Sequence, residues 1–484
     1  MFTLCSLALS GSILWLFVTE NGVGISPDSV DYYTTAQHWV AHQGFIQFNG
    51  QPLVIFPLGY PLFLGICLKS FPISIIALAN VLQPLLLLLL LCLCCLLAYR
   101  VFAHSSIAYV LVIGIVTSSY CLFDIYTMLW SETLFLIISL LVIGVLYQYL
   151  QKPSWQLLTL AAFLLAFLCI TRLAGVAFAG SAVLCMLLFD QQTLWQKTIR
   201  FFYVGVLSSS LLIANLVRNY CVTGWLTGIR QASDRTLYEN IGYWGGVLLN
   251  WLQLPNSNAM IHFCIGTLVW LGLVWLCINR WKQTNNLLCT MLMIHGLVYV
   301  LFAVTTASIS KYEPLNNRLL SPAYVPLLLG TAGIMSSFKQ TRKTHISGLL
   351  LGLALILAQY VSLYQQYQDI VDDGIPGYTE KNLVSHPLIQ QISKPNEWMR
   401  MGKATVYSNA YEAAHFFSGL PCLSVPEAAH THLIHSYLHS PPHYLIWFFD
   451  DYDNTAILRL PILLQNRKVD TLVSVKEGQI LWLH

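Results

Sequence analysis

Long hydrophobic runs separated by short polar turns occupy the first three quarters of the chain. A helix that crosses the hydrocarbon core of a membrane needs about 20 predominantly apolar residues. Stretches near that length cover residues 3–19, 71–99, 105–121, 132–149, 156–170, 173–189, 200–217, 261–279, 286–306, 318–336 and 346–363. The pattern therefore predicts an all-α polytopic membrane protein with about eleven transmembrane helices.

One further apolar segment, residues 53–68, is interrupted by Pro57, Gly59 and Pro61. We interpret it as a re-entrant or interfacial helix, because proline and glycine break a short span. If this segment does not span and the N-terminus lies inside, most turns rich in Lys and Arg fall on the cytoplasmic side, as the positive-inside tendency requires. The loops 20–52, 122–131, 218–260 and 307–317, and everything after about residue 364, then face the outer side.

The composition changes beyond Gln365, where charged residues and histidine become more frequent. Alternating or short apolar runs predict strands at 404–407, 444–449, 472–475 and 479–483, and residues 411–417 predict a short helix. The chain is thus expected to consist of a transmembrane domain, residues 1–365, and a small α/β domain, residues 366–484, on the outer or periplasmic side.

The composition excludes some classes of protein. Of the 484 residues, 56% are hydrophobic and 9% are charged, whereas soluble domains carry about 25% charged residues. The net charge of +3 is small and scattered, so no nucleic-acid partner is expected. Most cysteines lie inside apolar runs and no zinc-ligand spacing occurs, so we expect no metal-ligand set.

An acidic stretch, residues 26–33, follows the first hydrophobic segment. Asp28 and Asp31 open an amphipathic stretch, Val30 to Gln43. In one interpretation Asp28 is a helix N-cap and Asp31 a first-turn acid, both favoured by helix-end electrostatics. In the other, a partly desolvated carboxylate at the membrane surface has the basicity to accept a proton from a hydroxyl. The two interpretations are compatible.

The same region resembles a known family. The run Asp28-Ser29-Val30-Asp31-Tyr32, then Ala36, Gly44, Gly50 and residues 56–62, resembles the first outer loop of GT-C-fold integral-membrane glycosyltransferases. These include protein mannosyltransferases and bacterial lipid A aminoarabinose transferases. In them an Asp, followed four residues later by Tyr, heads a juxtamembrane helix and is the catalytic base, and a Pro-rich juxtamembrane helix follows. The chain lacks the Lys that aminoarabinose transferases carry beside the Pro-rich turn.

Further matches extend the resemblance over roughly residues 15–330. They are the Ser-Glu element in Trp130 to Phe135, Thr171-Arg172, Arg218-Asn219 followed by Gly224 and Gly228, and the Arg-x-x-x-Pro pattern in Asn317 to Pro322. The resemblance implies a GT-C fold with juxtamembrane helices in the first outer loop. It implies Asp28 as the catalytic residue. The substrate-binding residues would be Asp31, Tyr32, Tyr60, Glu132, Arg172, Arg218 and Arg318.

The three arginines fall on the outer side against the usual charge bias, where they could stabilise an anionic lipid phosphate or simply snorkel or pair with an acid. Glu132 could pair with such an arginine, bind a divalent cation or orient Asp28. No cofactor is specified by the sequence, and a divalent cation stays open.

The resemblance implies an inverting glycosyltransferase that moves a sugar from a polyprenyl-phosphate donor to a hydroxyl of a glycan, lipid or protein acceptor. It would act at the outer face of the plasma membrane, by analogy the bacterial inner membrane, among membrane lipids. A transporter or flippase, or a polymerase or ligase for lipid-linked glycans, is the alternative. A transporter would favour charged pairs near mid-span, whereas this chain gathers its polar groups at one boundary.

Overall fold

The structure is a computed structural model that describes residues 7, 9–11, 13–14, 17, 22–103, 105–255, 258–281, 287–338, 341–399, 404–428, 431–449 and 457–484. The chain forms two compact units. The helical unit comprises residues 1–20, 54–63 and 76–368, and the mixed unit comprises residues 21–53, 64–75 and 369–484. The predicted boundary at residue 365 stays a prediction, and the contacts additionally group most of the first loop with the C-terminal residues.

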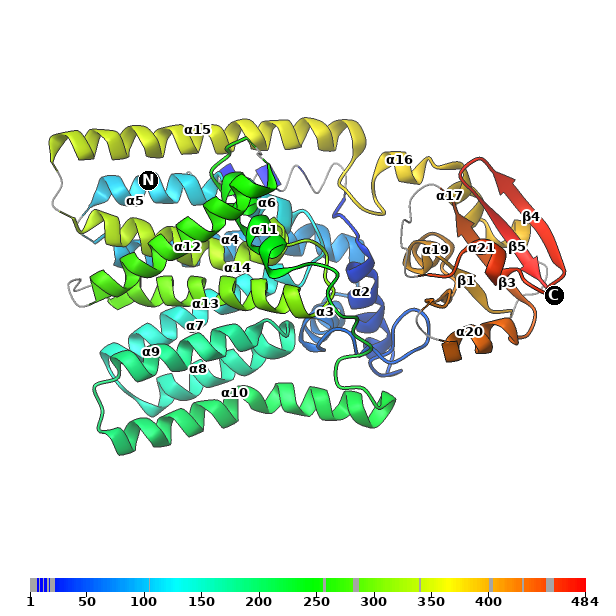
Figure 1. The fold of residues 1–484 in the computed structure, drawn as a ribbon, viewed down its shortest axis with the longest axis horizontal. Coiled ribbons are helices and arrows are strands. Elements are labelled where there is room, and N and C mark those ends of the chain that lie inside the picture. Colours follow the sequence, from blue (N-terminus) through cyan, green and yellow to red (C-terminus); the bar gives the residue numbers. More distant parts are fainter. Residues whose placement is uncertain are drawn as a thin grey trace. The chain divides into compact units, whose positions relative to one another are not determined.

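Long helices build the helical unit (Figure 1). They are α4 (Ile75–Val101), α5 (Ser106–Thr117), α6 (Tyr120–Tyr126), α7 (Glu132–Gln151), α8 (Trp155–Thr171), α9 (Gly175–Phe189), α10 (Leu194–Thr223), α11 (Leu237–Trp251), α12 (Ala259–Trp281), α13 (Leu287–Ile309), α14 (Asn317–Ser336) and α15 (Arg342–Asp373). Neighbours in this bundle include α7 with α8, α8 with α10, and α13 with both α9 and α14.

Each predicted hydrophobic segment from 71–99 onward contains a helix, but segment 105–121 is divided by a break between α5 and α6. Within the described residues, seven helices are long and apolar enough to cross a membrane, or eight if the bent pair α5 and α6 is one span. Helices α8 and α9, with 17 and 15 residues, fall short of that length. Segment 3–19 lies largely outside the described residues, so the number of eleven spans stays a prediction.

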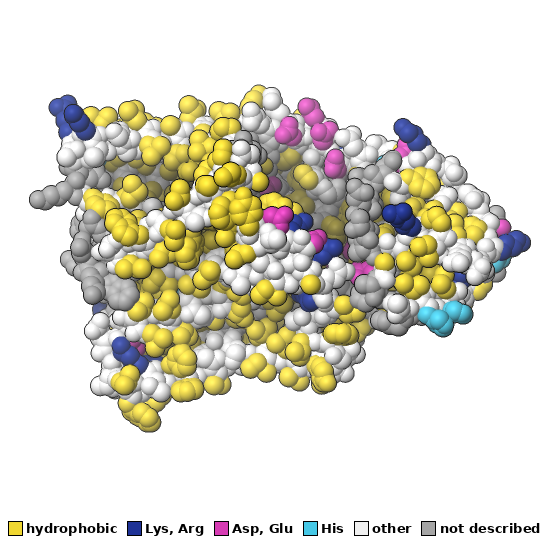
Figure 2. Space-filling view, in the orientation of Figure 1, with side chains coloured by type: hydrophobic (Ala, Val, Ile, Leu, Met, Phe, Trp, Pro, Cys, Tyr) yellow, Lys and Arg dark blue, Asp and Glu magenta, His cyan; other side chains and the backbone are white. Residues whose placement is uncertain are grey.

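Many hydrophobic side chains of the bundle face outward (Figure 2). Leu350 and Leu351 of α15 and Trp275 of α12 are exposed examples. Such exposure would be costly in water and matches a surface in contact with lipid tails. Between helices, glycines allow close packing: a Cβ on Gly330 of α14 would lie 3.0 Å from the carbonyl oxygen of Cys289 in α13.

Two further helices, α3 and α11, are not among the predicted spans. Helix α3 (Gly59–Ser70) has 12 residues, which is too short for a span and agrees with the predicted interfacial or re-entrant segment. Helix α11 lies in the long predicted outer loop 218–260, in which no helix was predicted. Its start is a capping box, in which Thr236 accepts from the backbone of Glu239 and Glu239 accepts from the backbone of Thr236.

The mixed unit contains α2 (Pro27–Val40) and a five-stranded sheet in the order β2-β1-β3-β5-β4. The strands are β1 (Val406–Ser408), β2 (Cys422–Ser424), β3 (His443–Phe448), β4 (Val469–Val475) and β5 (Gly478–Leu483). Its further helices are α16 (Lys381–Val384), α17 (Pro387–Ile392), α18 (Pro395–Trp398), α19 (Tyr411–Ser418), α20 (Thr431–Leu438) and α21 (Leu460–Leu463). The predicted small α/β fold is thus confirmed, and only β2 was missed among its strands.

The sheet has a point where the strand order reverses. Strand β1 pairs in parallel with β2 on one side and β3 on the other, and the chain visits β2 before it returns to β3. Ligand crevices of open α/β sheets form at the carboxyl ends of strands at such a point. Helix α19 begins directly beyond the carboxyl end of β1 (Figure 1).

Candidate functional site

Helix α2 begins at a serine cap. Ser26 is the N-cap, the backbone N–H of Ser26 donates to the hydroxyl oxygen of Ser29 at 3.0 Å, and Pro27 occupies the first turn. Proline is favoured there because its missing N–H would be unsatisfied anyway. The interpretation of Asp28 as the N-cap and Asp31 as the first-turn acid is therefore wrong, because Asp28 is the second residue of the helix and is itself the first-turn acid. The helix also begins three residues before the predicted Val30.

The two aspartates of α2 have different surroundings. Asp28 is partly exposed, whereas Asp31 is buried, with 8% of its surface accessible. Tyr32, which follows Asp28 by one helical turn, is buried as well. Burial raises the pKa of Asp31 well above its ordinary value, and the carboxyls of Glu412 and Asp28 add to that rise. The surroundings of Asp31 therefore favour its protonated, neutral form over the carboxylate.

Glu412 was not identified from the sequence as a site residue. It lies in the first turn of α19, which packs against α2. Burial raises its pKa to about 7, the hydrogen bond from Tyr411 opposes that rise, and Asp28 adds to it. The sequence predicts the helix that carries Glu412. It does not indicate that this helix packs against α2, because the two helices are far apart in the sequence, with most of the helical unit between them.

Other contacts fix α2 within the mixed unit. The N–H of Tyr378 donates to the carbonyl of Ile25 at 2.7 Å, just before the helix begins. Phe48, in the loop after the helix, stacks on His415 of α19 with ring centroids 4.7 Å apart. The residue before α2 and the loop after it therefore both contact the C-terminal part of the chain.

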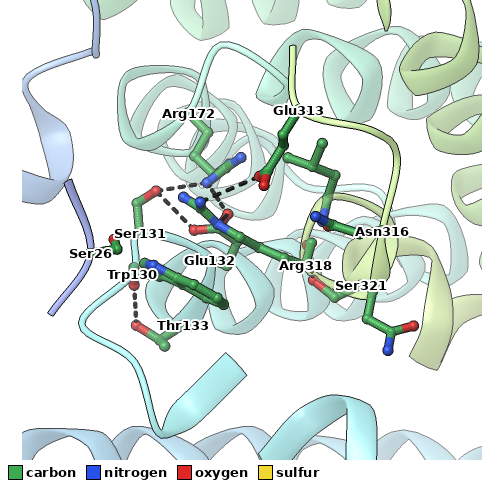
Figure 3. A network of polar contacts seen from close by, with 12 residues as sticks. Ser26, Trp130, Ser131, Glu132, Thr133, Arg172, Glu313, Asn316, Arg318 and Ser321 are labelled. Carbon is green, nitrogen blue, oxygen red and sulfur yellow. Dashed lines mark hydrogen bonds and ion pairs between the residues drawn. The ribbon is translucent and has the colours of Figure 1, made fainter. Parts of the chain in front are cut away.

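A charged cluster lies in the helical unit and joins Glu132, Arg172 and Arg318 (Figure 3). The Oε1 atom of Glu132 lies 2.6 Å from Nη1 of Arg172 and 2.6 Å from Nε of Arg318. The carboxylate side chain is 1% exposed, and the arginine side chains are 17% and 12% exposed. One buried carboxylate thus connects two guanidinium groups from distant parts of the sequence.

Three helix ends bring this cluster together. Glu132 is in the first turn of α7, Arg172 is the C-cap of α8, and Arg318 is in the first turn of α14, which contacts α7. An acid at a helix N-terminus and a base at a C-terminus both interact favourably with the helix dipole. The helix dipoles therefore stabilise the negative charge of Glu132 and the positive charge of Arg172 at these positions.

Neighbouring side chains hold the two guanidinium groups. Arg172 also donates to the hydroxyl of Ser131 at 2.9 Å. The guanidinium of Arg318 lies over the ring of Trp130, 4.3 Å from its centroid, and Nη1 lies 3.4 Å from the exposed Glu313. Figure 3 shows these groups converging on Glu132. The two arginines are balanced in charge by Glu132 and the exposed Glu313, so what suits an anionic ligand here is the pair of oriented guanidinium groups.

The Pro-rich segment reaches the same end of the bundle. Gly59 abuts the end of α8, where an added Cβ would lie 2.6 Å from the carbonyl oxygen of Ile170. Tyr60, the next residue, is completely buried. The N–H of Leu58 donates to Oδ1 of Asn215 in α10 at 3.3 Å. Segment 54–59 therefore links the ends of α8 and α10, next to Arg172.

Arg218 lies at that end of α10. Its Nη1 donates to Oδ1 of Asn219 at 3.1 Å, and Asn219 in turn donates to the carbonyls of Val54 and Leu226. Arg230 donates to the carbonyl of Ile55 at 3.0 Å. The Arg-Asn pair and the long outer loop thus hold the Pro-rich segment in place.

The structure brings Glu132, Arg172 and Arg318 into direct contact and gathers Asp28, Asp31 and Tyr32 on one helix of the other unit. Tyr60 and Arg218 lie at the same end of the helical unit as the charged cluster. Of the three interpretations of Glu132, pairing with arginine is observed. Within the described ranges, no three His, Cys, Asp or Glu side chains are arranged to hold a metal ion. The assigned roles stay predictions.

The sequence matches no protein-family model and no curated protein. Its fold is nevertheless similar to solved membrane-protein structures. ArnT from Cupriavidus metallidurans bound to undecaprenyl phosphate aligns over 99% of this chain and 97% of its own, with a TM-score of 0.63 and 11% identity. The apo oligosaccharyltransferase from Archaeoglobus fulgidus aligns over 97% of this chain and 73% of its own, with a TM-score of 0.58 and 10% identity.

The arabinofuranosyltransferase AftD from Mycobacteria is also similar, with a TM-score of 0.54 and 11% identity. This chain aligns over 99% of its length but spans only 39% of AftD. These neighbours share the GT-C fold. The predicted GT-C fold is therefore confirmed for this chain. At such low identities the similarity establishes the fold alone.

Proposed function

We propose that this protein is a membrane glycosyltransferase that moves a sugar from a polyprenyl-phosphate donor to an acceptor hydroxyl. The observation that carries the proposal is the GT-C fold, which aligns almost end to end with an ArnT structure bound to undecaprenyl phosphate. The cluster of Glu132, Arg172 and Arg318 supports it, because its two oriented guanidinium groups suit a phosphate that leaves as an anion.

In this proposal Asp28 accepts the proton of the acceptor hydroxyl. The acceptor oxygen attacks the anomeric carbon as the bond from that carbon to the phosphate oxygen breaks, so the configuration inverts. Arg172, Arg218 and Arg318 stabilise the charge that develops on the lipid phosphate. The reaction requires Asp28 and these arginines to act on the same pair of substrates.

The remaining site residues support these groups. Asp31 and Tyr32 orient α2, Tyr60 contributes to the wall of the donor site, and Glu132 fixes the directions of two guanidinium groups. The reaction would take place at the outer face of a bacterial inner membrane, with the C-terminal part of the chain on the periplasmic side. The acceptor is a glycan, a lipid or a protein.

Replacing Asp28 by Asn tests the proposal. The carboxamide keeps the shape of the side chain but cannot accept the hydroxyl proton, so transfer from radiolabelled polyprenyl-monophosphate sugars should fall at least ~100-fold, in the range of general base catalysis. Asp372→Asn, an exposed aspartate in α15, is the matched control and should keep full activity. Retained turnover in folded Asp28→Asn protein would remove Asp28 as the base.

Two alternatives give different results in the same preparation. A polymerase or ligase for lipid-linked glycans would use a pyrophosphate carrier and not a monophosphate carrier. A flippase would move a fluorescent lipid-linked sugar between leaflets of proteoliposomes without forming a new glycosidic bond. Product formation from the monophosphate carrier alone supports the proposal.

A further inference from the structure

A second polar cluster lies in the helical unit, at the end of α7 opposite to Glu132. The hydroxyl of Tyr149 donates to Oδ2 of Asp190 at 2.8 Å and accepts from Nη1 of Arg200 at 2.8 Å. Nη1 of Arg200 also lies 3.6 Å from Oδ2 of Asp190, and both side chains are largely buried. Glu132 and Tyr149 lie in the first and last turns of α7, about 26 Å apart along its axis. That separation is close to the thickness of the hydrocarbon core, so the two clusters lie at opposite boundaries of the membrane.

Aromatic rings from α8 and α10 surround this second cluster. Trp155, the first residue of α8, packs edge-on against Tyr203 of α10, with ring centroids 5.3 Å apart. The guanidinium of Arg200 lies 5.7 Å from the ring centroid of Trp155 and 5.6 Å from that of Tyr149. The hydroxyls of Thr159 and Tyr203 lie 2.8 Å apart. The starts of α8 and α10 are therefore fixed against each other, and the ring of Trp155 keeps a defined position although it is 51% exposed.

Two lysines lie just beyond this cluster. Lys152 is the C-cap of α7, one turn after Tyr149, and Lys197 is in the first turn of α10, one turn before Arg200. Because Tyr149 and Arg200 are in direct contact, both lysines belong to the same end of the bundle.

Large apolar side chains accompany the lysines. Leu194 is 82% exposed and Trp195 is 73% exposed, both in the first turn of α10. Lys152 is exposed as well, and Lys197 is partly exposed. We call these accessible side chains the α7–α10 corner; they are Lys152, Trp155, Leu194, Trp195 and Lys197.

Helices α7 to α10 offer no acid to these lysines. Between Glu132 and Asp234 the sequence contains a single acidic residue, Asp190. Asp190 is 3% exposed and is already bonded to Tyr149 and Arg200. Among the residues that the structure describes, neither lysine forms an ion pair. The corner therefore carries positive charge that these helices do not balance.

We propose that the α7–α10 corner binds the headgroup of an anionic phospholipid. Exposed tryptophan favours the zone between acyl chains and headgroups, and lysine extends its ammonium toward a phosphate while its methylene stem stays on apolar surface. A lipid satisfies both the lysines and the exposed Trp and Leu side chains, whereas a soluble phosphate would satisfy the lysines alone. The inference does not rest on the proposed function, because the corner lies at the opposite end of α7 from the charged cluster.

Lipid titration of the full chain in a neutral detergent tests the proposal, with binding measured by native mass spectrometry. Wild type should bind phosphatidylglycerol at least ~10-fold more tightly than zwitterionic phosphatidylcholine. Lys152→Gln combined with Lys197→Gln should weaken phosphatidylglycerol binding about 25-fold, since each lysine near anionic lipid contributes about 5-fold. Binding of phosphatidylcholine should not change. Equal affinity of wild type for the two lipids would overturn the proposal.

A matched double variant separates a local site from the overall charge. Arg342→Gln combined with Lys343→Gln removes the same charge from the exposed start of α15 and should keep the affinity for phosphatidylglycerol. An equal loss in both double variants would overturn a site at this corner. Lys152→Arg combined with Lys197→Arg keeps the charge and should bind as wild type does.

Two further measurements test the lipid character of the ligand. Trp195→Ala should weaken the binding of both lipids by a similar factor, because the ring contributes apolar contact and no charge. Glycerol 3-phosphate, a soluble anion with the same phosphate group, should not displace phosphatidylglycerol at equal concentration. Displacement would assign the corner to a soluble anion and overturn the proposal.

Discussion

Oε1 of Glu132 lies 2.6 Å from Nε of Arg318, although the two residues belong to helices far apart in the sequence. The same oxygen lies 2.6 Å from Nη1 of Arg172. Glu132 therefore fixes the directions of two cations at one end of the bundle. A phosphate that binds there would meet guanidinium groups already oriented, which limits the reorganisation needed during reaction.

Removing the charge of Glu132 should destabilise the protein. Glu132→Gln leaves two guanidinium groups without their shared carboxylate, and breaking a buried ion pair from one side costs about 3–5 kcal/mol. Thermal unfolding in detergent should show a clear decrease in Tm. Glu313→Gln is the control, because Glu313 is 44% exposed and its pair with Arg318 is worth about 0–1 kcal/mol. Equal effects of the two variants would contradict a structural role for Glu132.

Arg318→Lys should weaken donor use while keeping the charge. Lysine cannot reproduce the planar fork or the contact with Trp130, so kcat/KM for the lipid-phosphate donor should fall by about 10- to 100-fold. Arg342→Lys, at the exposed start of α15, should leave kcat/KM unchanged. Steady-state kinetics with varied donor measure both. Full activity of Arg318→Lys would show that only charge matters at this position.

Gly59→Ala should displace the Pro-rich segment. Its Cβ would lie 2.6 Å from the carbonyl oxygen of Ile170 and 2.8 Å from the backbone nitrogen of Thr171, and backbone cannot move aside as a side chain can. We expect a loss of about 1–3 kcal/mol in unfolding free energy. Gly180→Ala in α9 is the control, since no atom lies within 4 Å of its added Cβ. It should be neutral or slightly stabilising, because alanine favours helix.

Chelation of divalent cations should not abolish transfer. The one acid of the charged cluster that could hold a cation is Glu132, and its Oε1 atom already accepts from two arginines. Transfer is measured after incubation with EDTA and again after Mg²⁺ or Mn²⁺ is added back. If EDTA abolishes transfer and an added cation restores it, a metal ion takes part in the reaction and is bound by residues outside this cluster.

Only part of the candidate site could be predicted from the sequence. The sequence identified Glu132, Arg172 and Arg318, because each lies at the end of a hydrophobic run and matches a family pattern. It did not predict that both arginines pair with the same oxygen of Glu132. Glu412 was missed, since a single Glu in a short polar helix carries no sign of its partner. The wrong N-cap at Asp28 came from weighing acids at helix starts above the serine two residues earlier.

The sequence alone determined most of the long helices, although not α11, because hydrophobic length and the turns between runs are local properties that need no knowledge of distant residues. It also determined most strands of the C-terminal part, through alternation and turn residues. Only the tertiary structure decided which helix ends meet: Arg172 with Glu132 and Arg318, Gly59 with Ile170, and α2 with α19. Such contacts depend on packing between segments that lie tens to hundreds of residues apart, and the free energy that selects them arises only when the chain is folded.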